Sequence, residues 1–107
     1  MGYPGEFELL VLLSVMRLRN GAYGVTIREE VERETSRVIT LGAVYKTLGR
    51  LEGKGYLDTR MAPPTRARGG RRKKLYTLTP AGLETTRRSP ADLKRMTEGL
   101  GAELKLS

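Results

Sequence analysis

Apolar residues in the first half of the chain recur at intervals of three and four, which predicts three consecutive helices. The first is an almost continuous apolar stretch that follows Glu6 and Glu8 and stops at Asn20-Gly21. Its acids lie at the start and its bases at the end, as the helix dipole favours. The second helix is expected over residues 26–35, and the third over residues 40–54 with a threonine as its N-cap.

The second and third predicted helices each divide into an inward and an outward face. In the second, Ile27 and Val31 point inward, and the charged residues are expected on the wet side: Arg28, Glu29, Glu30, Glu32, Arg33 and Glu34. In the third, the core-facing stripe consists of Leu41, Val44, Tyr45, Leu48 and Leu51. Together with the first helix, these stripes predict one small hydrophobic core.

Two later segments alternate apolar and polar residues with the period of a half-buried strand. They are residues 56–61 and 74–79, and the stretch between them contains Pro63-Pro64 and Gly69-Gly70, which are turn signals. The pattern predicts a β-hairpin in which Tyr76, on the returning strand, belongs to the core. Three helices followed by a hairpin are the layout of a winged helix-turn-helix, a mostly α (α+β) fold.

The end of the chain carries two helix starts. The first is Thr79-Pro80, and the second is Ser89-Pro90, where Asp92 completes a pattern close to a capping box. After the second start, an amphipathic stripe suited to pairing two chains consists of Leu93, Met96, Leu100 and Leu104. Leu9 and Leu13 of the first helix are its expected partners. Residues 1–88 are interpreted as the winged-helix domain and residues 89–107 as a dimerisation element, with a frayed tail as the alternative, because Gly99 and Gly101 weaken the helix.

Composition narrows the chemistry that the chain can perform. The 107 residues include neither cysteine nor histidine, which removes disulfides, thiolate metal sites and the Ser-His and Cys-His pairs of many hydrolases. We therefore expect no cofactor and no catalytic site. The longest apolar run, from Leu9 to Met16 with Ser14 as an interruption, is much shorter than the roughly 20 residues that span a bilayer. With no signal-peptide pattern at its start, the chain is expected to be cytoplasmic.

The net charge of +8 is concentrated in one segment. Residues 1–59 contain eight Lys or Arg and eight Asp or Glu, whereas residues 60–74 contain seven cations and no acid. A basic run of this kind is either a solvated loop or, at the tip of a hairpin, a wing that meets DNA phosphates. The hairpin pattern favours the wing, whose candidate DNA contacts are Arg66, Arg68, Arg71, Arg72, Lys73 and Lys74.

The outer face of the third helix is the second candidate DNA contact. Gly42, Lys46, Arg50 and Lys54 follow one another at intervals of four and form a cationic row. Small residues beside them leave room for a DNA groove to approach the backbone. Thr40, at the start of the helix, joins the candidates. An ordinary solvated face is the alternative interpretation of the row.

Three segments of the sequence resemble the PadR-type transcriptional regulators. They are Gly-Ala-Tyr-Gly at residues 21–24, the stretch at residues 42–57, and Gly-Gly-Arg-Arg-Lys-Lys-Leu-Tyr-Thr-Leu-Thr-Pro-Ala-Gly at residues 69–82. The resemblance implies a homodimer that binds an inverted-repeat operator in double-stranded DNA and usually represses transcription, with release by a small molecule in some members. It also implies that Tyr23, Tyr45 and Lys46 lie near the DNA, although Tyr45 has an equal alternative as a core residue.

Other functions remain to be weighed against a sequence-specific repressor. The same charges would serve a non-specific or architectural DNA-binding protein, because phosphate contacts carry no sequence information. A winged helix that docks an acidic protein is a third possibility, and an enzyme is the least favoured, since no residue pattern supports one. No effector pocket can be derived from the pattern, although Tyr3 and Phe7 are candidate members of one.

Overall fold

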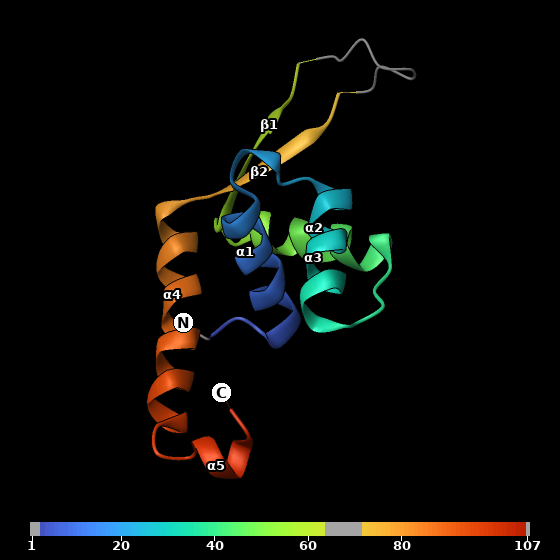
Figure 1. The fold of residues 1–107 in the computed structure, drawn as a ribbon. Helices are drawn as coiled ribbons and strands as arrows, with labels where there is room; N and C mark the ends of the chain where they lie inside the picture. Colours follow the sequence, from blue (N-terminus) through green and yellow to red (C-terminus); the bar gives the residue numbers. More distant parts are fainter. Residues whose placement is uncertain (1–2, 64–71, 107) are drawn as a thin grey trace.

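The computed structural model describes residues 3–63 and 72–106, and their elements follow the predicted order (Figure 1). Three helices are followed by two strands and a long C-terminal helix, which confirms the winged helix-turn-helix. The elements are α1 (Glu6–Leu18), η1 (Arg19–Gly21), α2 (Gly24–Thr35), α3 (Leu41–Gly53), β1 (Leu57–Met61), β2 (Lys74–Leu78), α4 (Pro80–Thr97) and α5 (Gly101–Leu104). Within the described ranges, no helix combines the length and the apolar character needed to cross a membrane.

The core lies where α1, α2 and α3 pack against the base of the hairpin. Its fully or almost fully buried members are Val11, Leu12, Val15, Ala22, Ile27, Val44, Leu48, Leu51, Leu57 and Tyr76. Burial of one such aliphatic side chain contributes about 1.5–3 kcal/mol. The predicted stripe of α3 is therefore confirmed in its centre, and Tyr76 is a core residue as expected.

A threonine side chain caps the N-terminus of both α3 and α4. The Thr40 side chain accepts a hydrogen bond from the Ala43 backbone N–H (3.1 Å), and the Thr79 side chain accepts one from the Gly82 N–H (3.0 Å). Each bond satisfies a donor that a helix start leaves unpaired. The cap on the third helix is thus confirmed.

The hairpin is an antiparallel pair in register from Leu57–Leu78 to Met61–Lys74. It is attached to the helices by the backbone of β2, because the Tyr76 N–H donates to the Ala22 carbonyl at 2.9 Å. Tyr76 itself is 4% exposed. The wing therefore projects from the body with its base fixed to the segment that joins α1 to α2 (Figure 1).

The prediction of two separate C-terminal helices is wrong. Helix α4 is continuous from Pro80 to Thr97, with Pro90 inside it, so the second start at Ser89 does not form. Proline interrupts only one backbone hydrogen bond, and the helix continues on both sides of it. The true break is at Gly99, whose φ of +81° ends the helical path.

This break also divides the predicted dimerisation stripe. Leu93 and Met96 lie on α4, whereas Leu100 precedes α5 and Leu104 ends it. Their spacing predicts one stripe on one helix. The structure instead divides the four residues between α4 and the segment that contains α5. The proposed boundary between residues 88 and 89 falls within α4.

The first turn of α4 packs closely against Tyr56, in the turn between α3 and β1, because residue 82 has no side chain. A Cβ atom at Gly82 would lie 2.0 Å from the Tyr56 carbonyl oxygen, a distance that no backbone can tolerate. On the same contact, the Thr79 N–H donates to the Tyr56 carbonyl at 3.1 Å. Glycine at this position thus sets where α4 leaves the body.

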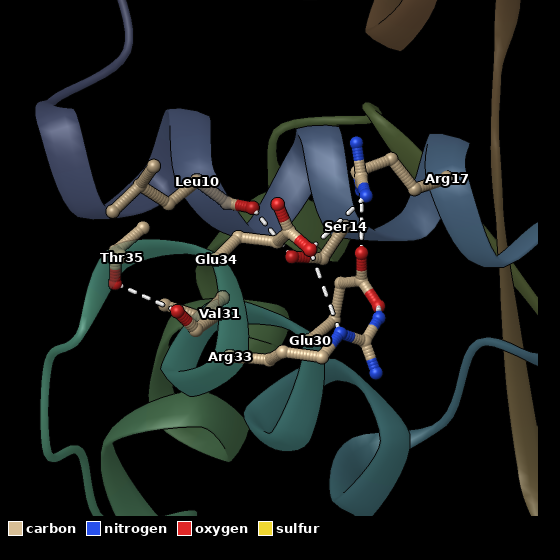
Figure 2. A network of polar contacts seen from close by, with 8 residues as sticks. All are labelled: Leu10, Ser14, Arg17, Glu30, Val31, Arg33, Glu34 and Thr35. Atoms are coloured by element: carbon tan, nitrogen blue, oxygen red, sulfur yellow. Dashed lines mark hydrogen bonds and ion pairs between the residues drawn. The ribbon is translucent and has the colours of Figure 1, made fainter.

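One charged residue of α2 is buried, contrary to the prediction. Glu30, expected on the wet side, is 4% exposed and accepts hydrogen bonds from Arg17 of α1 and Arg33 of α2 (Figure 2). Its position follows from the helical period, because Ile27, Glu30 and Val31 share the face that packs on α1. The Arg17 hydrogen bond is the main reason that the pKa of Glu30 lies below its ordinary value.

We expect Glu30→Gln to lower the free energy of unfolding by about 1–3 kcal/mol, because it removes the charge that satisfies two arginines. Since the folded pKa is lowered, this contribution is present above the ordinary value of 4.5 and is lost as the pH falls through the folded pKa. Urea unfolding from pH 7 to pH 3 measures both effects. Glu29→Gln, one residue away on the exposed face, is the matched control. Equal stability of the two variants at pH 7 would contradict the assignment.

Candidate nucleic-acid interface

The outermost face of α3 is almost free of side chains. Gly42, Lys46, Gly49 and Gly53 follow one another in steps of four, three and four, and all four are exposed. A Cβ atom added at any of the three glycines would have no neighbour within 4 Å. The glycines are therefore not required by packing within the chain, although each costs about 1 kcal/mol of helix propensity relative to alanine. Lys46 is the single long side chain on this face.

Tyr45 borders that face and is not part of the core. Its side chain is 49% exposed, so the predicted core role is wrong. The ring lies against Gly24 at the start of α2, where an added Cβ atom would be 2.5 Å from the Tyr45 Cζ and 2.6 Å from its hydroxyl. Glycine at position 24 thus allows the ring to rest on the helix backbone. This role of Gly24 was missed from the sequence, although the residue belongs to the Gly-Ala-Tyr-Gly motif.

The base of the wing meets the start of α2 through Tyr23. The Lys73 Nζ lies 4.5 Å from the centre of the Tyr23 ring and donates a hydrogen bond to the Tyr23 hydroxyl at 3.2 Å. A cation placed over an aromatic face is attracted by the electron density of the ring. This contact holds the Lys73 ammonium group beside the N-terminus of α2.

A hollow of about 400 Å³ lies among these elements. It is lined by Tyr23, Gly24, Val25, Tyr45, Met61, Arg72, Lys73 and Lys74. The fold therefore brings together two tyrosines and three wing cations that were proposed separately from the sequence. Tyrosine hydroxyls and cationic groups around one concave surface are suited to an anion such as a DNA phosphate.

The wing cations at the base differ in how they are held. The Arg72 Nε donates to the Ala62 carbonyl at 3.0 Å. The Lys74 Nζ lies 3.4 Å from a carboxylate oxygen of Glu52 and 5.6 Å from the centre of the Tyr76 ring. Arg66, Arg68 and Arg71 fall within residues 64–71 and are outside the described part of the chain.

The cationic row on α3 is not a uniform set of free charges. The Lys54 Nζ lies 3.1 Å from a carboxylate oxygen of Glu8 in α1, and the Arg50 Nε lies 3.5 Å from the same oxygen. Burial raises the pKa of Glu8, but the hydrogen bonds from Lys54, the Gly5 N–H and Arg50 outweigh it and lower the pKa below its ordinary value. In contrast, Lys46 has no ion-pair partner among residues 3–63 and 72–106.

Apolar side chains that the sequence assigns to dimerisation are partly or largely exposed. Leu9 and Leu13 are half-buried on α1, whereas the exposed residues nearer the C-terminus are Leu93 (59%), Met96 (75%), Leu100 (42%) and Leu104 (48%). A groove of about 380 Å³ separates α4 from the N-terminal segment and is lined by Tyr3, Pro4, Glu6, Leu9, Ser89, Asp92 and Leu93. Of the two aromatic residues considered for an effector pocket, only Tyr3 lines this groove, because Phe7 packs against the core.

Comparison with known proteins decides the family. The model of the transcriptional regulator PadR-like family matches residues 12–88, from the middle of α1 into α4. The chain belongs to the PadR-like family. As a member, it is a DNA-binding transcriptional regulator with a winged-helix fold, and not an enzyme. A comparison with curated proteins finds no significant match.

Solved structures show the same fold. A PadR family transcription regulator from hypervirulent Clostridium difficile has 24% identity and a TM-score of 0.73, over 94% of this chain and 99% of that one. A PadR family regulator from Eggerthella lenta has 26% identity and a TM-score of 0.65, over 95% and 88%. Bacillus subtilis PadR, solved in complex with operator DNA, has 22% identity and a TM-score of 0.61, over 77% of this chain and 45% of that one.

In this PadR-family protein, we expect Gly24→Ala to displace the Tyr45 ring. Because Tyr45 is a candidate DNA contact, the displacement should weaken duplex binding by up to about tenfold, the size of one lost hydrogen bond to a charged group. The fold should persist, because the clashing atoms are at the end of a half-exposed side chain. Duplex binding and the NMR signals of the Tyr45 ring measure the two effects. Gly101→Ala in α5, where an added Cβ atom meets only the Leu106 carbonyl oxygen at 4.0 Å, is the control and should leave both DNA binding and the Tyr45 signals unchanged. A Tyr45 ring that stays in place in Gly24→Ala would disprove the contact.

Proposed function

We propose that this regulator acts as a homodimer on an inverted-repeat operator and represses transcription, with α3 in the major groove and the wing on the phosphate backbone. The observation that carries the proposal is the combination of a smooth outer face on α3 with a cation- and tyrosine-lined hollow at the wing base. A helix with little side-chain bulk can approach base edges closely. The hollow beside it is suited to the adjoining phosphates.

The contacts divide into those that specify sequence and those that position the protein. Lys46, which projects from the centre of the smooth face, is the candidate for base edges, where lysine commonly meets the acceptors of guanine. Tyr23, Tyr45 and Lys73 line the hollow, where they are candidates for phosphate contacts. Thr40 and Gly42, at the start of α3, are placed for a phosphate at the positive end of the helix dipole. The structurally similar Bacillus subtilis PadR was solved in complex with operator DNA, which supports operator binding by a protein of this fold.

Apolar exposure supports the homodimer. Leu93 and Met96 on the C-terminal half of α4 lie largely in solvent, on the part of the helix that extends beyond the three-helix body (Figure 1). Leu9, at the groove between α1 and α4, continues this apolar surface. Exposed apolar residues gathered on one surface are typical of a protein interface. A second copy related by two-fold symmetry would cover the same residues on both chains and match an inverted repeat.

Removing charge from the wing should affect all DNA equally, whereas removing it from α3 should change the preferred sequence. We expect Arg72→Gln/Lys73→Gln to weaken binding to any duplex and to lower the salt slope by about 1–2. Lys46→Gln should reduce the preference for the operator by about 1–3 kcal/mol. Lys94→Gln on α4 is the charge-matched control for Lys46→Gln, and Arg87→Gln/Lys94→Gln on α4 is the control for the double variant.

The measurement is a titration against the upstream promoter region of the regulator's own gene and a scrambled duplex of equal length, at two salt concentrations. A preference for the promoter that survives the higher salt supports a specific regulator. Equal and salt-sensitive binding of the promoter and scrambled duplexes would instead indicate an architectural protein, provided that other genomic duplexes also show no preference. An unchanged preference in Lys46→Gln would contradict the role of that residue.

Introducing charge on α4 should dissociate the dimer without unfolding the protomer. Leu93→Asp/Met96→Asp places two carboxylates at positions that are 59% and 75% exposed in the single chain, so the fold should be retained. We expect the dimer dissociation constant to rise by about tenfold or more for each residue, measured by sedimentation velocity. Val38→Asp, at a 96% exposed position between α2 and α3, is the matched control. An undisturbed dimer in the double variant would rule out this interface.

A further inference from the structure

Glu8 links the first turn of α1 to the C-terminal half of the recognition helix. Its side chain is 12% exposed, and both carboxylate oxygens contact the Lys54 Nζ, at 3.1 and 3.2 Å. The Arg50 Nε lies 3.5 Å from one of these oxygens, and the Gly5 N–H donates to the other at 3.3 Å. The carboxylate is therefore held in place by three different residues.

The two cations are held less completely than the acid. Arg50 and Lys54 are 49% and 48% exposed, so each presents about half of its side chain to solvent. They follow Lys46 at intervals of four, which places the three residues along one flank of α3 at about 5–6 Å between successive Cβ atoms. The flank that carries Lys46 thus continues into two cations that share one carboxylate within the chain.

We infer that Glu8 is an internal counter-ion that withholds Arg50 and Lys54 from DNA phosphates and so limits the affinity of the protein for DNA of any sequence. The inference rests on the proposed DNA-binding function and adds to it a residue of α1. A phosphate that approaches either cation competes with a carboxylate that is already bound and partly desolvated. At the base of the wing, the only comparable pair among the described residues joins Lys74 to Glu52.

This arrangement matters because phosphate contacts raise affinity for operator and random DNA alike. Each cation that neutralises a phosphate steepens the dependence of log K on log salt by about 0.9. Two additional contacts would therefore strengthen the background binding that a specific regulator has to exceed. Glu8 keeps this background low without removing the cations from the surface.

The test compares Glu8→Gln with the unaltered protein on a random-sequence duplex at several salt concentrations. For each cation released, we expect binding to tighten about three- to tenfold near 0.1 M salt, and the salt slope to become steeper by about 1. Glu84→Gln, an exposed residue of α4 with the same change in charge, controls for net charge and should leave the slope unchanged. An identical slope in Glu8→Gln and the unaltered protein would overturn the inference.

Lys54→Gln, made in the unaltered protein and in Glu8→Gln, shows whether the gain in DNA affinity depends on the ion pair between Glu8 and Lys54. The substitution should change binding by less than about twofold beside the native Glu8, and should remove about half of the gain in the Glu8→Gln background. An equal loss in both backgrounds would mean that Lys54 already contacts DNA and would refute the role of Glu8. If Glu8→Gln fails to fold, Glu8→Asp retains the charge but shortens its reach and should give a smaller gain. Absence of duplex binding by the unaltered protein would refute the proposed function itself.

Discussion

Burial of the inner face of α3 against α1 fixes the position of every other functional group in the molecule. Val44, Leu48 and Leu51 are fully buried, so the helix cannot rotate about its axis without exposing a core side chain. Because residues three and four apart share a face, the opposite side must then present Gly42, Lys46, Gly49 and Gly53. The candidate DNA-binding face of α3 is thus a geometric consequence of the core.

The wing and the helices meet through a few contacts that are specific in their chemistry. The backbone of β2 is bound to the carbonyl of Ala22, and the Lys73 ammonium group lies over the Tyr23 ring. Both contacts involve the short segment between α1 and α2, which is therefore the point at which the hairpin is oriented. Tyr45 of α3 lies against Gly24, so the third helix also contacts the chain beside this segment. The hollow at the wing base exists because these three elements converge there.

Periodicity in the sequence was sufficient for the fold but not for the pairing of charges. The spacing of Leu48 and Leu51 and the alternation around Tyr76 predicted the helices and the hairpin, because burial leaves a regular pattern. The prediction that Glu30 faces solvent was wrong because it was based on the charge of the residue and not on its position in the helical period. The Lys54 partner of Glu8 lies 46 residues away, and no local pattern reports such a contact. Ser89-Pro90 has the local sequence pattern of a helix start. The helix that begins at Pro80 nevertheless continues through Pro90 to Thr97.

The contact between Gly82 and the Tyr56 carbonyl bears on the spacing of the proposed operator. It determines the direction in which α4 departs from the body, since no other residue type would let the two backbones approach so closely. In a dimer joined through the far half of α4, that direction sets the separation of the two recognition helices. Two major grooves on one side of B-DNA are about 34 Å apart, so only certain separations fit. The number of base pairs that this protein accepts between two half-sites would then depend on a hydrogen atom standing where every other residue type has a side chain.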